Sequence, residues 1–223
     1  MTRELAYVTA MPQSKEAIAN ILLDIGAVVL RPDQPFTWAS GIQSPIYCDN
    51  RLLISYPDLR EKICDAFLET MCQHNMACDL IAGVATGAIA HAAWIADRLK
   101  KPMVYIRSEA KGHGKQNRVE GKVTKGMKAV VIEDLISTGG SSVEAVEALR
   151  QSGVTADHCI AIFQYGFPEA TAKFKQINCR LETLTDFPTL LKVTKQRGTI
   201  TAEQEKLLAK FIQNPRGWQT KTT

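Results

Sequence analysis

The sequence lacks any apolar stretch long enough to cross a membrane. A membrane-spanning helix needs about 20 consecutive, mostly apolar residues, and no run in this chain approaches that length. The opening segment, MTRELAYVTAMPQSKEA, also lacks the apolar core of a secretory signal. These two absences lead us to expect a cytoplasmic protein with no membrane partner.

The cysteines form no recognisable metal or redox motif. None of the six belongs to a C-x-x-C pair, and none stands at zinc-finger spacing with the four histidines. His158 and Cys159 are adjacent, but they fall in a predicted strand, where neighbouring side chains point to opposite faces. We therefore expect the cysteines to be small core residues.

The chain also lacks internal repeats, low-complexity tracts and an interdomain linker. Its 223 residues suffice for one well-cored α/β domain with additions, and they are few for two full domains. The content of 45% apolar and 22% charged residues is ordinary for a globular protein. We expect a single domain over residues 1–223.

From residue 79 onward, strand patterns alternate with helix patterns. The apolar periodicity predicts strands over residues 79–84, 103–107, 129–134, 157–165 and 180–186. It predicts helices over residues 14–25, 57–74, 87–100, 141–152 and 201–213. Such alternation indicates a central parallel sheet flanked by helices, with ligands bound at the carboxyl ends of the strands.

Residues 130–142, VVIEDLISTGGSS, are the most informative stretch. A β-favouring run leads into Glu133 and Asp134, and a loop of glycines and small hydroxyl residues then precedes a helix. The N–H groups of such a loop, together with the positive end of a helix, bind anions. Two carboxylates suit the hydroxyls of a sugar, or a magnesium ion, beside that anion. The segment therefore predicts a ribose phosphate site.

Two nucleotide-binding motifs are excluded, and one simpler reading stays open. No Gly-Lys-Ser/Thr follows the glycines at 139–140, so the loop is not a Walker A motif. The fragment GHGKQN, residues 112–117, lacks the last glycine of a dinucleotide motif, and no helix pattern follows it. The alternative to a ribose phosphate site is an ordinary strand, turn and capped helix.

Basic residues are concentrated in one part of the chain. Residues 98–128 contain ten Lys or Arg and two acids, a local charge of +8 in a chain of net charge +4. The block has no interleaved aromatic residues and no recognition-helix pattern, so a small polyanion such as diphosphate explains it better than a nucleic acid. A solvated charged loop is the alternative for Lys122, Lys125 and Lys128.

A long polar loop, residues 107–121, lies within this block. Loops of this length inside a compact domain are usually functional or disordered. Arg107, Lys111 and His113 stand among glycines, which suits a lid that closes over an anionic substrate.

The segment around Glu133 resembles the binding motif of type I phosphoribosyltransferases. This resemblance implies that Glu133 and Asp134 hold the ribose hydroxyls of 5-phosphoribosyl 1-diphosphate, and that the following loop holds its 5-phosphate. The implied donor site comprises Arg107, Lys111, His113, Glu133, Asp134, Leu135, Ile136, Ser137, Thr138, Gly139, Gly140 and Ser141.

The polar loop is similar to the mobile catalytic loop of orotate phosphoribosyltransferases. The similarity rests on Lys111, His113, Gly114, Glu120 and Gly121, with Arg107 at the position of the arginine that opens the loop. Ser108 stands where many members have a lysine. The resemblance implies that Lys111, His113 and Asp134 are catalytic.

Residues 36–51, FTWASGIQSPIYCDNR, resemble the base-binding hood of the same family, with its S-G-x-x-S-P core. The resemblance implies that Tyr47, Cys48 and Ser137 contact orotate. Packing within the hood is the alternative role of Tyr47 and Arg51. Ala39 and residues 85–86 depart from one subgroup, which has lysine at the first position and Tyr-Lys at the second.

Three resemblances in the right order imply the type I phosphoribosyltransferase fold. We expect a small hood at about 27–56 together with neighbouring N-terminal segments, a core at about 75–190 and a C-terminal helix at about 201–213. The implied reaction joins orotate to the phosphoribosyl group, giving orotidine 5′-phosphate and diphosphate in UMP synthesis. Magnesium is implied, held mainly by the substrate's diphosphate and sugar, as is a homodimer with shared active sites.

Three other functions are weighed against this one. A phosphoribosyltransferase for uracil or a purine is disfavoured by the hood segment. A non-catalytic regulator that senses the donor is disfavoured by the intact acidic pair and loop, and by the lack of an added nucleic-acid module. A nucleic-acid binder that uses the basic block would show salt-sensitive binding.

Overall fold

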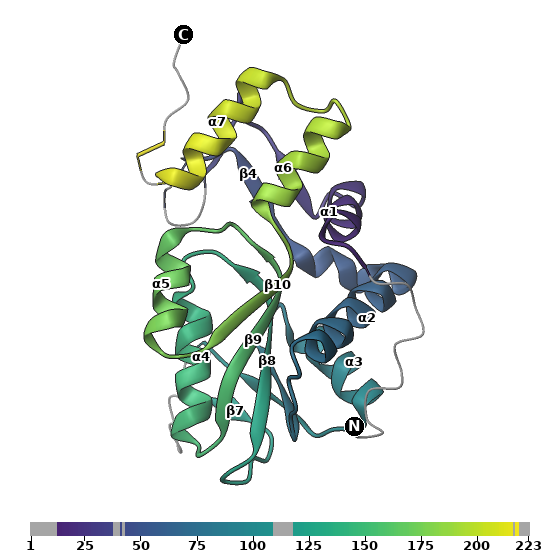
Figure 1. The fold of residues 1–223 in the computed structure, drawn as a ribbon, viewed down its shortest axis with the longest axis vertical. Helices are drawn as coiled ribbons and strands as arrows, with labels where there is room; N and C mark the ends of the chain where they lie inside the picture. Colours follow the sequence, from purple (N-terminus) through teal and green to yellow (C-terminus); the bar gives the residue numbers. More distant parts are fainter. Residues whose placement is uncertain (1–12, 38–40, 42, 109–117, 216, 219–223) are drawn as a thin grey trace.

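A six-stranded sheet forms the middle of the computed structural model, which describes residues 13–37, 41, 43–108, 118–215 and 217–218. The strand order is β10–β9–β8–β5–β6–β7, and Figure 1 labels β10, β9, β8 and β7 in this sheet. All neighbours pair in parallel except β7, which runs antiparallel to β6. The strands are β5 (Leu80–Val84), β6 (Met103–Ile106), β7 (Val119–Glu120), β8 (Lys128–Ile136), β9 (Thr155–Gln164) and β10 (Arg180–Asp186). The predicted parallel sheet is confirmed.

Helices cover both faces of this sheet. Figure 1 shows α4 and α5 on one side and α1, α2 and α3 on the other. The helices are α1 (Lys15–Asp24), α2 (Pro57–Gln73), α3 (Ile89–Leu99), α4 (Gly140–Gln151), α5 (Pro168–Gln176), α6 (Phe187–Gln196) and α7 (Ala202–Gln213). Among the residues described, no helix combines the length and apolar character needed to span a bilayer.

Successive residues of the central strands alternate between two hydrophobic clusters. In β8, Val130 and Ile132 belong to the cluster on the α1–α3 side, whereas Ala129 and Val131 belong to the cluster beneath α4 and α5. This alternation is the period of two that a strand imposes on its side chains. Both faces of β8 are therefore buried, which explains its nearly continuous apolar sequence.

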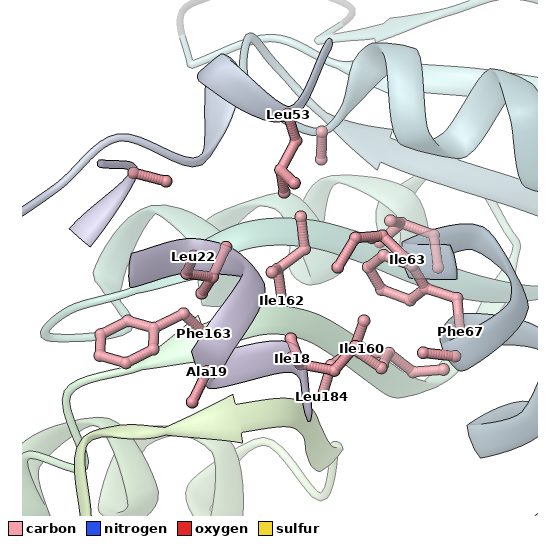
Figure 2. Packing of buried hydrophobic residues seen from close by; sticks show 14 of the residues in the cluster. Ile18, Ala19, Leu22, Leu53, Ile63, Phe67, Ile160, Ile162, Phe163 and Leu184 are labelled. Atoms are coloured by element: carbon pink, nitrogen blue, oxygen red, sulfur yellow. The ribbon is translucent and has the colours of Figure 1, made fainter. Parts of the chain in front are cut away.

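Figure 2 shows the first cluster at close range. Ile160 and Ile162 of β9 lie among Ile18 and Leu22 of α1 and Phe67 of α2. All five side chains are fully buried. The sheet that carries the strand ends is thus fixed by apolar packing.

The N-terminal part adds two small antiparallel sheets above the strand ends. Strand β1 (Val28–Leu30) pairs with β4 (Ile46–Cys48), and β2 (Phe36–Thr37) pairs with β3 (Gln43–Ser44). A 3₁₀ helix, η2 (Asn50–Ser55), leads from β4 to α2. We keep the name hood for residues 27–56. The limits of the hood and core remain predictions.

Capping residues in the sequence correctly marked the starts of helices α1 and α7. Ser14 caps α1 by accepting a hydrogen bond from the Ala17 N–H at 3.1 Å, and Thr201 forms a capping box with Gln204 at α7. Strand β8 extends to Ile136, two residues beyond the predicted end, so Glu133 and Asp134 lie inside the strand's last part.

Two α-helices, α5 and α6, were not predicted from the sequence. Helix α5 buries only Ala170 and Phe174, which gives a weak periodic pattern. Helix α6 follows β10 without a loop, because Asp186 both ends the strand and caps the helix, accepting from the Thr189 N–H at 3.0 Å. No turn residues therefore mark the boundary.

The cysteines have no disulfide partners, and three of them (Cys64, Cys159 and Cys179) are buried. The prediction of core cysteines is confirmed for these three. Cys159 is fully buried while its neighbour His158 is partly exposed, as expected for adjacent strand residues.

Candidate functional site

The polar residues singled out in the sequence gather at the carboxyl ends of the central strands. Glu133 and Asp134 belong to the end of β8, and the loop of residues 137–139 joins this strand to α4. Residues 85–88 follow β5, and Arg107 follows β6. In a parallel sheet these strand ends form one edge, which is where α/β proteins bind ligands.

Glu133 is a buried carboxylate with both oxygens occupied. Only 5% of the surface of Glu133 is exposed. One oxygen, Oε1, accepts from the Asp134 N–H at 3.0 Å, and the other, Oε2, accepts from the Ser142 hydroxyl at 2.7 Å. Burial, followed by the charge of Asp134, raises the pKa of Glu133 well above its usual value.

Asp134 is only half-buried and is enclosed by two other segments. Its backbone carbonyl accepts a hydrogen bond from the Asn50 side-chain amide at 2.6 Å. Its carboxylate lies against Gly87, where an added Cβ would be 2.1 Å from Oδ2. The carboxylate therefore occupies the space that any larger residue at position 87 would need. A cis peptide joins Ala85 and Thr86 in the same loop.

The loop before α4 has the geometry of an anion cradle. Gly139 adopts a left-handed φ of +76° immediately before the first residue of the helix. An added Cβ there would approach Ala170 Cα to 3.2 Å, so both conformation and space favour glycine. Ser137 and Thr138 are half-buried and Ser141 is exposed at the helix start. The positive end of α4 thus faces a site lined by hydroxyls.

A lysine from α5 adds positive charge beside this cradle. Lys173 Nζ lies 3.7 Å from the Cβ position at Gly140. It also pairs with Glu169 at 2.7 Å along the same helix. An ammonium at this distance favours a phosphate at the start of α4.

The two ends of the predicted lid are held together at the sheet edge. The Arg107 N–H donates to the Arg118 carbonyl at 2.9 Å, and Arg118 Nε donates to the Arg107 carbonyl at 2.9 Å. The Arg107 guanidinium lies 3.6 Å from Glu120. Lys111 and His113, predicted to be catalytic, lie outside the described residues.

The hood brings Tyr47 and Cys48 towards the same edge. The Tyr47 ring is 5.5 Å from the ring of Phe36, and the residue is 42% exposed. The Cys48 thiol donates to Asn50 Oδ1 at 3.4 Å. Burial, and then the charge of Asp134, raise the pKa of Cys48 well above its usual value. This thiol is therefore a neutral group beside the acidic pair.

Arg51 has a local role in the hood. Its Nε and Nη2 atoms bond the two carboxylate oxygens of Asp49 at 2.7 and 2.8 Å. This bidentate pair occupies the guanidinium, which is the geometry of the packing alternative for Arg51.

Comparison with known proteins decides the family. The family model of the phosphoribosyl transferase domain matches residues 57–183. The orotate phosphoribosyltransferase of Halalkalibacterium halodurans is 50% identical over 201 residues, covering 90% of this chain and 96% of that protein. The chain belongs to the orotate phosphoribosyltransferase family.

Solved structures agree with this membership of the orotate phosphoribosyltransferase family. The orotate phosphoribosyltransferase of Aeropyrum pernix has a TM-score of 0.72 and 31% identity, over 82% of this chain and 99% of that one. The UMP synthase of Leishmania donovani has a TM-score of 0.76 and 29% identity. That match covers 89% of this chain and 42% of the synthase chain. The resemblance seen in the three sequence motifs is confirmed.

Sequence reasoning missed several residues that shape this orotate phosphoribosyltransferase site. Gly87 makes room for Asp134, Ser142 binds Glu133, Asn50 binds the Asp134 carbonyl, and Lys173 lies beside the cradle. Lys173 belongs to a helix that was not predicted. Gly87 had one usable signal, since it lies three residues after the buried strand β5, in a loop where a glycine permits another group to approach closely.

The burial of Glu133 predicts a pH-dependent stability. A carboxyl whose pKa is higher in the folded than in the unfolded protein contributes stability at low pH, and this contribution is lost as the pH rises above the unfolded value. Relative to Glu133→Gln, the wild type should therefore lose free energy of unfolding as the pH rises above 4.5, the ordinary pKa of a glutamate. Urea denaturation at several pH values measures this difference. Glu147→Gln, on the exposed side of α4, is the control, and parallel curves for wild type and Glu133→Gln would contradict the prediction.

Gly87→Ala should displace the Asp134 carboxylate, because the new Cβ would lie 2.1 Å from Oδ2. We expect kcat/KM for 5-phosphoribosyl 1-diphosphate to fall about tenfold or more, since small displacements of reacting groups are costly. Ala93→Ser, an equally small addition at an exposed position of α3, should leave this constant unchanged. Steady-state kinetics decide, and a Gly87→Ala enzyme with wild-type kinetics would show that Asp134 does not need this space.

Proposed function

We infer that this protein transfers the 5-phosphoribosyl group from 5-phosphoribosyl 1-diphosphate to orotate, forming orotidine 5′-phosphate and diphosphate. The observation that carries this assignment is the 50% identity to an orotate phosphoribosyltransferase over 90% of the chain. The site agrees with it, because an acidic pair, an anion cradle and a hood meet at one edge of the sheet.

The acidic pair and the cradle hold the donor. Asp134 and Glu133 accept hydrogen bonds from the ribose hydroxyls, and residues 137–141 donate to the 5-phosphate at the start of α4. Glu133 must exchange or share its present bonds to do so, since both its oxygens are already occupied. The binding energy of the phosphate then fixes the sugar for reaction.

The reaction itself is a substitution at the anomeric carbon. The bond from this carbon to the diphosphate oxygen breaks first, and its electrons leave with the diphosphate. The orotate nitrogen then forms a bond to the carbon and loses its N–H proton to solvent or to the departing diphosphate. The sugar becomes cation-like between the two events, and the negative field of Asp134 stabilises it. Lys111, His113 and Arg107 offset the charge of the departing diphosphate, with Lys111 or His113 as the acid.

Magnesium fits this site as an ion carried by the substrate. Within the described residues, no group of three or more histidine, cysteine, aspartate or glutamate side chains is arranged to hold a metal. Mg²⁺ often binds through substrate phosphates and only one or two carboxylates, which the half-exposed Asp134 can supply. When bound, the ion would neutralise part of the diphosphate charge.

We propose that orotate binds under the hood. Tyr47 offers a partly exposed ring, and Cys48 offers a neutral thiol beside the acidic pair. Ser137, which lies in the cradle, is the third residue that we expect to contact orotate. A neutral contact surface suits a base that is itself an anion, because a thiolate there would repel it.

The direct test is the ultraviolet absorbance of orotate. Addition of 5-phosphoribosyl 1-diphosphate and Mg²⁺ should consume orotate in proportion to the diphosphate released, and a chelator should stop the reaction. Uracil and adenine are tested as alternative substrates, and RNA is tested as an alternative ligand, in the same assay series. Turnover of uracil or adenine without turnover of orotate would overturn the assignment.

We also propose a homodimer with shared active sites. Large exposed apolar side chains support it: within the described part of the chain they are Tyr47, Leu52, Ile54 and Tyr56, all in the hood. Three of them lie in η2 or directly after it. Such a concentration of exposed apolar side chains in one segment favours an interaction between subunits.

Mixing two inactive variants tests the shared site. Lys111→Ala removes a loop contribution and Asp134→Asn removes a sugar contact, so each homodimer should be nearly inactive. After subunit exchange, heterodimers should have one intact site, restoring about a quarter of wild-type activity for random pairing. The same mixture carrying Leu52→Asp and Ile54→Asp should recover nothing and should elute as monomers. If the first mixture recovered no activity although subunit exchange had been demonstrated, this result would contradict shared active sites.

A further inference from the structure

Asn50 is a buried polar residue of the hood that contacts the central sheet. It is the first residue of η2 and lies two residues after the end of β4, the strand that carries Tyr47 and Cys48. Only 1% of its surface is exposed. A buried amide needs hydrogen-bond partners, because an unsatisfied one costs free energy. The hydrogen-bond partners of the Asn50 amide therefore identify the interactions that keep it in this buried position.

The Asn50 amide bonds to both sides of the site. Its Nδ2 donates to the Asp134 carbonyl at 2.6 Å, and its Oδ1 accepts from the Cys48 thiol at 3.4 Å. A carbonyl oxygen can only accept, so the NH₂ end of the amide must face Asp134. The orientation of the side chain is thus fixed chemically.

The bond to Asp134 lies where the sheet gives β8 less support. The pairing of β5 with β8 ends at Gly83 and Ile132. Two residues further on, the carbonyl of Asp134 is bonded by Asn50, which is 84 positions away in the sequence. A hood residue thus binds the backbone of the acidic pair at the point where a neighbouring strand has ended.

We propose that Asn50 is a positioning residue that fixes the orotate-binding hood relative to Asp134, so that base and sugar are aligned for bond formation. This inference rests on the proposed function, in which orotate lies under the hood and ribose lies on β8. The two reacting partners then sit on separate segments. A displacement of about 1 Å between such segments can cost about a hundredfold in rate.

A comparison of the binding of two ligands distinguishes this positioning role from a general effect on stability. The donor's sugar and 5-phosphate contact β8 and α4, whereas orotidine 5′-phosphate spans the cradle and the hood at once. Loss of the Asn50 bond should therefore weaken binding of the nucleotide about tenfold and change binding of 5-phosphoribosyl 1-diphosphate less than about twofold. The turnover number should fall about tenfold to a hundredfold.

The experiment compares Asn50→Ala and Asn50→Leu with wild type by calorimetric titration of both ligands and by steady-state kinetics. Asn50→Leu fills nearly the same space without a donor. Asn20→Ala is the matched control, since the Asn20 amide also donates to a backbone carbonyl, that of Glu16 at 2.8 Å, and accepts from Arg197 Nε at 2.8 Å, outside the proposed site. Unfolded molecules lower the titrated stoichiometry and leave the dissociation constant of the folded fraction unchanged.

A selective loss of nucleotide affinity in both Asn50 variants, with Asn20→Ala like wild type, supports the proposal. Equal losses for both ligands, or no loss for either, overturn it. A wild-type enzyme that neither binds orotidine 5′-phosphate nor consumes orotate would instead overturn the proposed function, so the two failures are distinguishable.

Discussion

The burial of a carboxylate beside a second carboxylate is the constraint on which this site depends. Glu133 is 5% exposed and adjoins Asp134 at the end of a strand buried on both faces. Such a pair is costly, because burial and like charge both disfavour ionisation. The surrounding structure offsets part of this cost with two hydrogen bonds, from the Asp134 N–H and the Ser142 hydroxyl. The site is stable because its neighbours are arranged around the charge.

The anion cradle follows from the same arrangement. Ser142 lies in the first turn of α4, so its bond to Glu133 ties the helix start to the strand end. The left-handed Gly139 turns the chain sharply enough for the helix to begin there. Its closeness to Ala170 also fixes α5 against the loop and brings Lys173 near. The proposed sugar site and the proposed phosphate site are therefore built from one strand, one turn and one helix.

The sequence was sufficient to predict the sheet, the acidic pair and the cradle, because each is encoded by neighbouring residues with a clear period or turn chemistry. Gly87, Ser142 and Asn50 were not predicted as parts of the site. Their roles depend on contacts between segments distant in the chain, and nothing local distinguishes Asn50 from a turn residue. The helices α5 and α6 were missed for local reasons, namely few buried positions and an absent loop. The roles of Gly87, Ser142 and Asn50 thus depend on tertiary contacts, which local sequence patterns do not encode.

The use of a neutral amide to join hood and strand has an electrostatic reason. A lysine or arginine at position 50 could also donate to the Asp134 carbonyl, but its charge would pair with the nearby carboxylates. Those carboxylates would then be less available to sugar hydroxyls and would exert a weaker field on a cation-like sugar. An apolar residue would leave the carbonyl of Asp134 without the donor that it now has at 2.6 Å. An uncharged donor avoids both costs, so the residue that links the hood to the strand leaves the charge of the acidic pair intact.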